Sequence, residues 1–108
     1  MIDVLVVGAG PAGSVAAAVL ARAGVRVRVV DRAIFPRDKL CGDTINPGTI
    51  ALLKRLGLAS SIEACGLPID GMRVSGERGG NAVVVEGRYP DGVTARALLR
   101  RDFDWMLL

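Results

Sequence analysis

Three glycines near the start of the chain have the spacing of a phosphate-binding turn. Gly8, Gly10 and Gly13 follow the apolar run 4–7, whose β-branched and leucine composition predicts a strand buried on both faces. In such a turn the first glycine permits the bend, the second lets a pyrophosphate approach without meeting a Cβ, and the third lets the helix pack close to the strand. A dinucleotide's phosphates would then lie at the N-terminus of the following helix, where free N–H groups and the helix dipole favour negative charge.

Asp31 is the second candidate for nucleotide binding, because it ends the next apolar run. It follows Gly13 by 18 positions, close to the spacing of roughly 20 at which a carboxylate at the end of the second strand reaches the ribose hydroxyls. A glycine-rich turn alone is weak support for a ligand, since such turns also occur without one. Here the strand, the turn, the helix and the terminal acid agree, so a dinucleotide site is favoured over a strand–turn–helix without a nucleotide.

The composition excludes several other kinds of site. The chain of 108 residues has no histidine, and its cysteines, Cys41 and Cys65, are 24 positions apart. We therefore predict no metal site and no His-based triad, and no catalytic residue is assigned. A net charge of +3 suits a phosphate-bearing ligand, but the basic residues are scattered and only 4% of residues are aromatic, so no nucleic-acid surface is expected.

The N-terminal apolar stretch also has the length of a membrane span. Residues 4–21 contain no charge, but three glycines, a proline and a serine interrupt them, and Asp3 stands where a signal peptide would be basic. We therefore expect neither a transmembrane segment nor a signal peptide, and a cytoplasmic location.

The elements that position the turn form a β-α-β unit. A helix is expected over 12–23, ending before Gly24, and valines alternate with arginines over 25–30 as a second strand. A right-handed crossover of this kind makes the two strands parallel. The expected fold is accordingly α/β, with a Rossmann-like βαβ unit at its start.

The rest of the chain predicts a different arrangement. Two β-rich runs, 69–75 and 81–86, flank the glycine-bearing loop 76–80 and predict an antiparallel hairpin. We interpret 68–88 as the start of a second sheet that faces a substrate, with a decorative hairpin as the alternative. The other expected elements are a loop over 32–44, an amphipathic helix from Pro47 to Leu56, a shorter helical segment over 59–65, a strand or helix start over 93–99, and a helix over 100–108.

Three separated segments resemble one family of flavoprotein oxidoreductases, which includes geranylgeranyl reductases, flavin-dependent halogenases and aromatic hydroxylases of the para-hydroxybenzoate hydroxylase type. The first is the turn 8–13, G-A-G-P-A-G, which resembles the FAD variety of the motif through Pro11 and Ala12. Asp31 and Arg32 are similar to the acid–arginine pair after the second strand, where glutamate is the more usual acid. The resemblance implies that Asp31, with Arg32, holds the adenosine ribose of FAD.

The second and third segments are similar to flavin-contacting parts of the same family. Residues 35–43, F-P-R-D-K-L-C-G-D, resemble the F-P-R-x-K-x-C-G segment of the reductase branch, which lies against the flavin. This implies that Cys41, Gly42 and Asp43 approach the isoalloxazine ring or the ribityl chain, although the branch often has glycine where Asp43 stands. Residues 100–107 are similar to R-x-x-F-D-x-x-L, whose arginine contacts FAD, and the spacing selects Arg100 over its neighbour. A solvated pair of arginines is the alternative.

The resemblance implies a partial site. Residues 1–108 are expected to form a single, partial FAD-binding domain, because family members are several times longer and their later Gly-Asp motif and remaining strands are absent from this sequence. We expect such a fragment to expose a hydrophobic strand edge and, alone, to aggregate or to bind FAD weakly.

The implied activity is that of a flavin-dependent oxidoreductase, most like geranylgeranyl reductases, which reduce isoprenoid double bonds. NAD(P)H is the expected external reductant, and a small-molecule or isoprenoid substrate would bind through sequence beyond Leu108, with room for a peripheral membrane contact. The open alternatives are an aromatic hydroxylase or halogenase, a non-catalytic nucleotide-binding fragment, and an NAD(P)-binding domain. In the last case Asp31 would favour NAD over NADP, because its charge would repel a 2′-phosphate.

Overall fold

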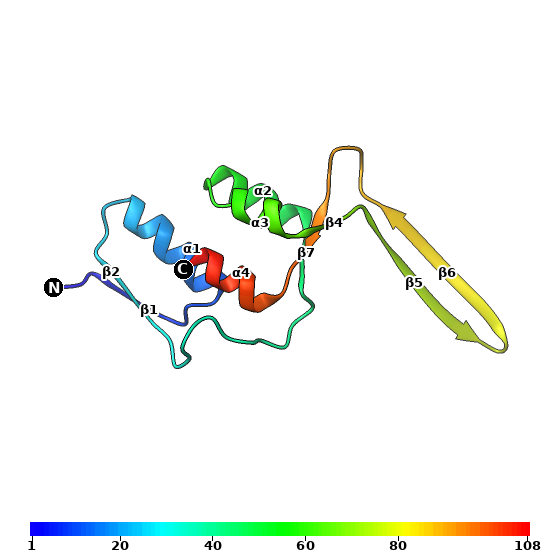
Figure 1. Ribbon diagram of the computed structural model, residues 1–108, viewed down its shortest axis with the longest axis horizontal. Helices are drawn as coiled ribbons and strands as arrows, with labels where there is room; N and C mark the ends of the chain where they lie inside the picture. Colours follow the sequence, from blue (N-terminus) through cyan, green and yellow to red (C-terminus); the bar gives the residue numbers. More distant parts are fainter.

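A computed structural model describes residues 1–108 as an elongated molecule, 64 × 31 × 21 Å, in which a long hairpin projects from a body of helices and short strands (Figure 1). The strands form three separate sheets: the parallel pair β1-β2, the three-stranded sheet β3-β7-β4 and the antiparallel pair β5-β6. None of the four helices combines the length and the hydropathy that a membrane span requires.

The chain begins with the predicted β-α-β unit. β1 (Val4–Val7) pairs in parallel with β2 (Val27–Val30), and α1 (Pro11–Arg22) connects them. The expectation that β1 is buried on both faces is wrong: Val4 and Val6 are half-buried, whereas Leu5 and Val7 are 52% and 79% exposed. The reason is that α1 covers one face of a two-stranded sheet whose other face and outer edge have no neighbour in this chain.

The helical body holds the hydrophobic core. It contains α2 (Pro47–Arg55), α3 (Ser60–Cys65) and α4 (Arg100–Leu107). α2 begins where the sequence predicts, because the Thr49 N–H donates to Asn46 Oδ1 at 2.8 Å and Pro47 occupies the first turn. Six buried apolar side chains make up the core: Ile45, Ile50, Leu53, Ala59, Ile62 and Phe103.

A small antiparallel sheet lies beside these helices, and the sequence analysis did not predict it. β7 (Ala95–Ala97) is its central strand, so the ambiguous segment 93–99 contains a strand. β3 (Thr44–Ile45) and β4 (Leu67–Ile69) pair with β7 on either side. Strands of two or three residues are too short to show alternation, and these three come together only through long-range pairing.

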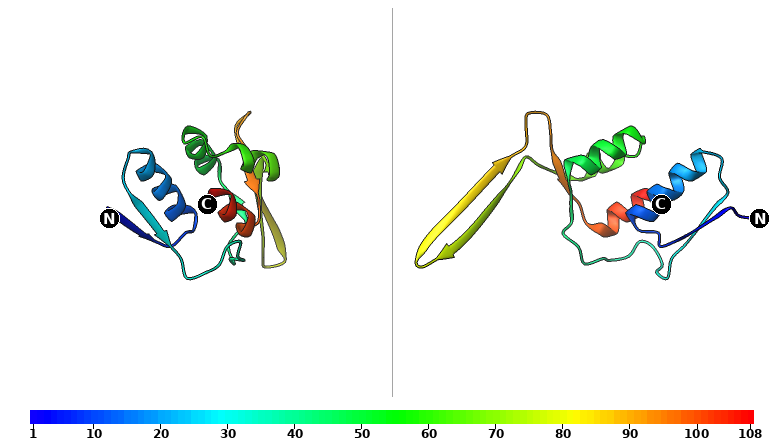
Figure 2. Two further views of the ribbon diagram at one scale, coloured as in Figure 1. Left: turned by 60° about the vertical axis from the view of Figure 1, so that its left-hand side comes forward. Right: turned by 180° about the vertical axis from the view of Figure 1, so that it is seen from behind.

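The projecting hairpin consists of β5 (Gly71–Arg78) and β6 (Asn81–Arg88), and Figure 2 shows it as an arm that leaves the body. Its predicted five-residue loop is wrong. Only Gly79 and Gly80 connect the strands. Their φ values of +61° and +80° suit the two-residue hairpin turn that needs positive φ at both positions, and glycine adopts such values readily. Gly76 therefore lies within the ladder, opposite Val83. That 68–88 starts a substrate-facing sheet stays a prediction.

Candidate dinucleotide-binding site

The glycine turn connects β1 to α1 with its backbone in close contact. Gly8 has a φ of +105°, which side chains disfavour, and its N–H donates to the Val30 carbonyl at 2.7 Å. A Cβ on Gly13 would lie 1.8 Å from the Gly8 carbonyl oxygen and 3.3 Å from a Val6 methyl carbon. Only glycine fits at position 13, because α1 packs directly on the turn.

The N-terminus of α1 is open to an anion. Gly10 is the N-cap and offers no capping side chain, while Pro11 has no N–H. The backbone N–H groups of Ala12 and Gly13 donate to no acceptor in the chain. Unpaired first-turn donors and the positive end of the helix dipole together favour a phosphate group at this end of α1.

Asp31 has a structural role that the sequence analysis did not predict. The Ala9 N–H donates to Asp31 Oδ2 at 2.7 Å, and the Ala33 N–H donates to Oδ1 at 2.8 Å. These two donors, Ala33 first, hold the pKa of the Asp31 carboxyl below its ordinary value of 3.8. Each oxygen keeps a further lone pair for a ribose hydroxyl, so the carboxylate braces the turn and remains able to bind. Arg32, beside it, is exposed.

Two arginines from distant segments meet beside the turn. A Cβ built on Gly10 would lie 3.8 Å from Arg37 Nη2 and 4.0 Å from Arg100 Nη2. Both guanidinium groups contact Asp104, whose side chain is fully buried. Arg37 Nη2 is 3.0 Å from Oδ2, while Arg100 Nε and Nη2 donate to Oδ1 and Oδ2 at 2.8 and 3.1 Å. Two cations share this one carboxylate, and Arg37 also interacts electrostatically with the Asp31 carboxylate at longer range.

Arg37 also carries an unsatisfied donor. Its Nη1 is buried without a hydrogen-bond partner, while its guanidinium carbon lies 4.7 Å from the centre of the Phe35 ring. A buried charged donor without an acceptor is costly, and the guanidinium group that carries it forms strong hydrogen bonds to phosphate oxygens. The residues around the turn therefore fit the pyrophosphate of a dinucleotide.

Arg37 and Asp104 were not predicted as site residues, although both lie inside segments that resemble flavin-contacting parts of the family. Arg37 belongs to the F-P-R run, and Asp104 to the R-x-x-F-D run. The available signal was the chemistry of these two residues, an arginine and an acid inside segments already assigned to the flavin. The contact between Arg37 and Asp104 could not be predicted from the sequence, since the two residues are far apart in the chain.

The Cys41–Asp43 segment is attached to the start of α4. Asp43 has a φ of +41°, and its Oδ1 accepts a hydrogen bond from the Arg100 N–H at 3.1 Å. A glycine there would adopt this φ but could not provide the acceptor. Asp104 first, and the Cys41 side chain to a lesser extent, raise the pKa of Arg100 above its ordinary value. The predicted residues Cys41, Gly42, Asp43 and Arg100 thus lie in one region; Cys41 and Gly42 are exposed.

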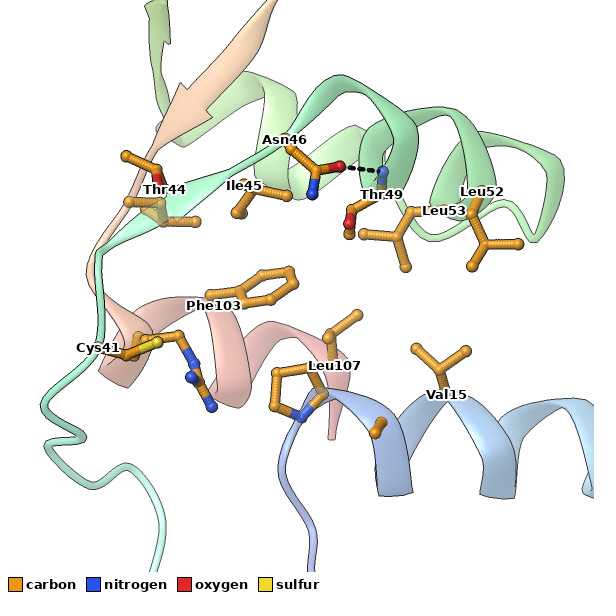
Figure 3. A pocket seen from close by; sticks show the side chains of 14 residues that line it. Val15, Cys41, Thr44, Ile45, Asn46, Thr49, Leu52, Leu53, Phe103 and Leu107 are labelled. Carbon is orange, nitrogen blue, oxygen red and sulfur yellow. Dashed lines mark hydrogen bonds between the residues drawn. The ribbon is translucent and has the colours of Figure 1, made fainter. Parts of the chain in front are cut away.

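A cavity of about 330 Å³ continues from the turn into the helical body. Figure 3 shows Phe103 and Leu107 of α4 and Val15 of α1 on one side, facing Leu53 of α2 on the other. Pro11, Ala12, Cys41 and Arg100 also line it. The volume lies at the lower end of the range for small-molecule sites.

Comparisons with known proteins find flavoprotein relatives of this chain. The family model described as "FAD binding domain" matches residues 1–104. The chain is 58% identical to menaquinone reductase of Mycolicibacterium smegmatis over 74 residues. This matched stretch covers 68% of this chain and 18% of that protein. The chain is 43% identical over 74 residues to squalene monooxygenase SE2 of Panax ginseng, covering 68% of this chain and 13% of that protein. The chain thus spans less than a fifth of these relatives.

Solved structures of flavin enzymes share the fold. The myxobacterial chondrochloren halogenase CndH superposes with a TM-score of 0.81 at 33% identity, over 99% of this chain and 25% of that one. The flavin-dependent brominase Bmp2 gives 0.79 at 28% identity, over 98% and 26%. The α/β class, with a βαβ unit and an antiparallel hairpin in about a quarter of a larger fold, is confirmed.

Proposed function

This chain belongs to the FAD binding domain family, and on that premise we propose that it is the N-terminal FAD-binding portion of an oxidoreductase that reduces an isoprenoid substrate. The observation that carries the cofactor assignment is the meeting of Arg37 and Arg100 beside Gly10, at the open N-terminus of α1. The substrate class is supported by the 58% identity to menaquinone reductase and by the resemblance to geranylgeranyl reductases.

Each part of FAD has candidate residues in this proposal. The turn 8–13, including Pro11 and Ala12, takes the pyrophosphate, and Asp31, with Arg32 nearby, takes the adenosine ribose. The Cys41–Asp43 segment lies toward the ribityl and isoalloxazine end; Arg100 is bonded to it through its backbone N–H, while its guanidinium group faces the pyrophosphate turn. When bound, FAD supplies the electron transfer, with NAD(P)H as the proposed reductant, while the chain's residues bind and orient it.

A flavin-dependent halogenase or aromatic hydroxylase is the second candidate. The TM-score of 0.81 with CndH favours it, since that enzyme shares the whole arrangement of this chain. Its 33% identity is lower than the 58% shared with menaquinone reductase, although the latter covers fewer residues. We therefore place the reductase first.

FAD titration of the purified chain tests the cofactor assignment. We expect binding that perturbs the visible flavin spectrum, even if the affinity is low. Gly10→Val should abolish it while the circular dichroism is retained, because the added side chain points toward Arg37 and Arg100. Gly76→Val is the matched control: nothing lies within 4 Å of its Cβ position, and it stands on the remote hairpin. Binding of NAD without flavin, or equal FAD binding by Gly10→Val, would refute the assignment.

A chimaera tests whether this chain can serve as the FAD-binding portion of a menaquinone reductase. Residues 1–108 would replace the corresponding N-terminal segment of the M. smegmatis menaquinone reductase, and NAD(P)H-dependent reduction of menaquinone would be measured. We expect the chimaera to bind FAD and to retain this reduction, and the Gly10→Val chimaera to lose both. A chimaera that holds FAD but does not reduce menaquinone would count against the isoprenoid-reductase proposal and leave the FAD assignment intact.

A further inference from the structure

Asp104 has no direct part in the FAD contacts proposed above, yet it is one of the most buried residues of the molecule. Its side chain has no exposed surface, and both oxygens face guanidinium groups. One partner, Arg100, is one turn earlier on α4, whereas Arg37 comes from the long connection after β2. A fully buried carboxylate is rare unless it is paired, so this position serves the two arginines.

The carboxylate determines where both arginines lie. Arg100 uses Nε and Nη2 in a two-point contact with Oδ1 and Oδ2, which orients the plane of its guanidinium group. Arg37 Nη2 approaches the same Oδ2 at 3.0 Å, and the buried Nη1 of Arg37 has no hydrogen-bond partner. Without an anion between them, two adjacent guanidinium groups that are each about four-fifths buried would repel one another and separate.

The pair lies where a diphosphate would need it. Both Nη2 atoms are within 4.0 Å of the Cβ position of Gly10, the N-cap of α1, and the free Ala12 and Gly13 N–H groups lie in the first turn of that helix. Two cations and a helix N-terminus offer more positive charge than one phosphate group needs. Asp104 neutralises part of that charge and leaves a net surplus for the ligand.

We propose that Asp104 is a positioning residue of the phosphate subsite, which holds Arg37 and Arg100 side by side so that together they recognise a diphosphate. This inference rests on the proposed FAD-binding function and concerns how the same site selects its ligand. Arg37 is, on this account, a binding residue, and Asp104 acts through it and through Arg100.

A purely structural role for Asp104 leads to a different expectation. If the carboxylate only joined α4 to the body, its loss would weaken every ligand alike through partial unfolding. A positioning role instead lowers affinity in proportion to the phosphate content of the ligand. It also makes the effects of Asp104 and Arg37 substitutions non-additive, because replacing Arg37 removes the guanidinium group that Asp104 positions.

The test measures the affinity of the whole chain for FAD, ADP and riboflavin, with Asp104→Asn against the control Asp102→Asn. Asp102 is exposed on the same helix and forms no ion pair. We expect Asp104→Asn to weaken the binding of FAD and of ADP by about 10- to 100-fold, which corresponds to the loss of a charged hydrogen bond. The affinity for riboflavin should change by less than about 2-fold. Asp102→Asn should leave all three unchanged.

A double-mutant cycle with Arg37→Met provides the second readout. We expect Arg37→Met to weaken ADP binding strongly in the wild-type chain and only slightly in Asp104→Asn. If Asp104→Asn does not fold, Asp104→Glu replaces it, since it keeps the charge and displaces the arginines by one methylene. Equal weakening of ADP and riboflavin, additive effects in the cycle, or unchanged ADP binding would each overturn the positioning role. A wild-type chain that binds neither FAD nor ADP would instead refute the proposed function itself.

Discussion

The turn 8–13 and the β5-β6 hairpin are both short segments organised by glycine, but they are held in opposite ways. Contacts from distant parts of the chain hold the turn: the Ala9 N–H donates to Asp31, 22 positions away, and the Gly8 N–H donates to the Val30 carbonyl. The hairpin is held by the ladder between its own two strands, and every residue of β6 is exposed. A site that must place charges accurately needs support from several segments, whereas a hairpin needs only its turn and its register.

The hairpin nevertheless has two distinct faces. Met72, Val74, Val83 and Val85 alternate onto one face, and the other carries the ion pair between Arg73 and Glu86 at 2.9 Å. Such alternation is typical of a strand pair that covers an apolar layer on one side. It supports the proposal that 68–88 starts a second sheet.

The largest expected effect separates the body from the hairpin. Phe103→Ala should destabilise the chain by about 3–5 kcal/mol, because this ring is only 5% exposed and lies in the core. Val84→Ala, at a hairpin position that is 56% exposed, should change the free energy of unfolding by no more than about 0.5 kcal/mol. Chemical denaturation measures both. Similar effects of the two substitutions would show that the hairpin contributes to the core after all.

The next effect distinguishes the glycines of the two regions. Gly13→Ala should cost about 3 kcal/mol and abolish FAD binding, since its Cβ would overlap the Gly8 carbonyl oxygen at 1.8 Å. Gly87→Ala, whose Cβ would meet nothing within 4 Å, serves as the control and should leave FAD binding unchanged. Denaturation and FAD titration check the pair, and a Gly13→Ala variant with wild-type affinity would contradict the close packing.

A smaller effect concerns pH. Because backbone N–H groups hold the pKa of Asp31 below 3.8 in the folded chain, its contribution to stability is complete above about pH 4 and is lost as the pH falls through the folded value. Asp31→Asn should therefore be less stable than wild type near neutral pH, and the difference should shrink below about pH 4. Asp91→Asn, on an exposed turn, should follow the wild-type curve. A difference that does not change with pH would rule out the charged form as the cause.

The smallest effect belongs to the hairpin surface. Arg73→Gln removes a cross-strand ion pair whose side chains are 69% and 39% exposed, so it should cost at most about 0.5 kcal/mol. FAD affinity should be unchanged, as measured by titration. A loss of FAD affinity in this variant would show that the two regions are coupled.

Local patterns made much of the fold predictable. The βαβ unit follows from an apolar run, the glycine spacing and the alternating valines, and the hairpin follows from two β-rich runs around glycines. The hairpin loop was predicted too long, since Gly76 can occupy a ladder as well as a loop. The β3-β7-β4 sheet was missed because strands of two or three residues have no periodicity of their own.

What the sequence by itself determined is the turn: only glycine permits the φ of Gly8 and the backbone contact at Gly13, and these constraints are local. Tertiary structure alone decided which charges surround it. Arg37 and Asp104 meet because the connection after β2 and the start of α4 come together at the N-terminus of α1. Ion pairing between segments far apart in the chain depends on the packing of whole elements, and residue spacing contains no record of it.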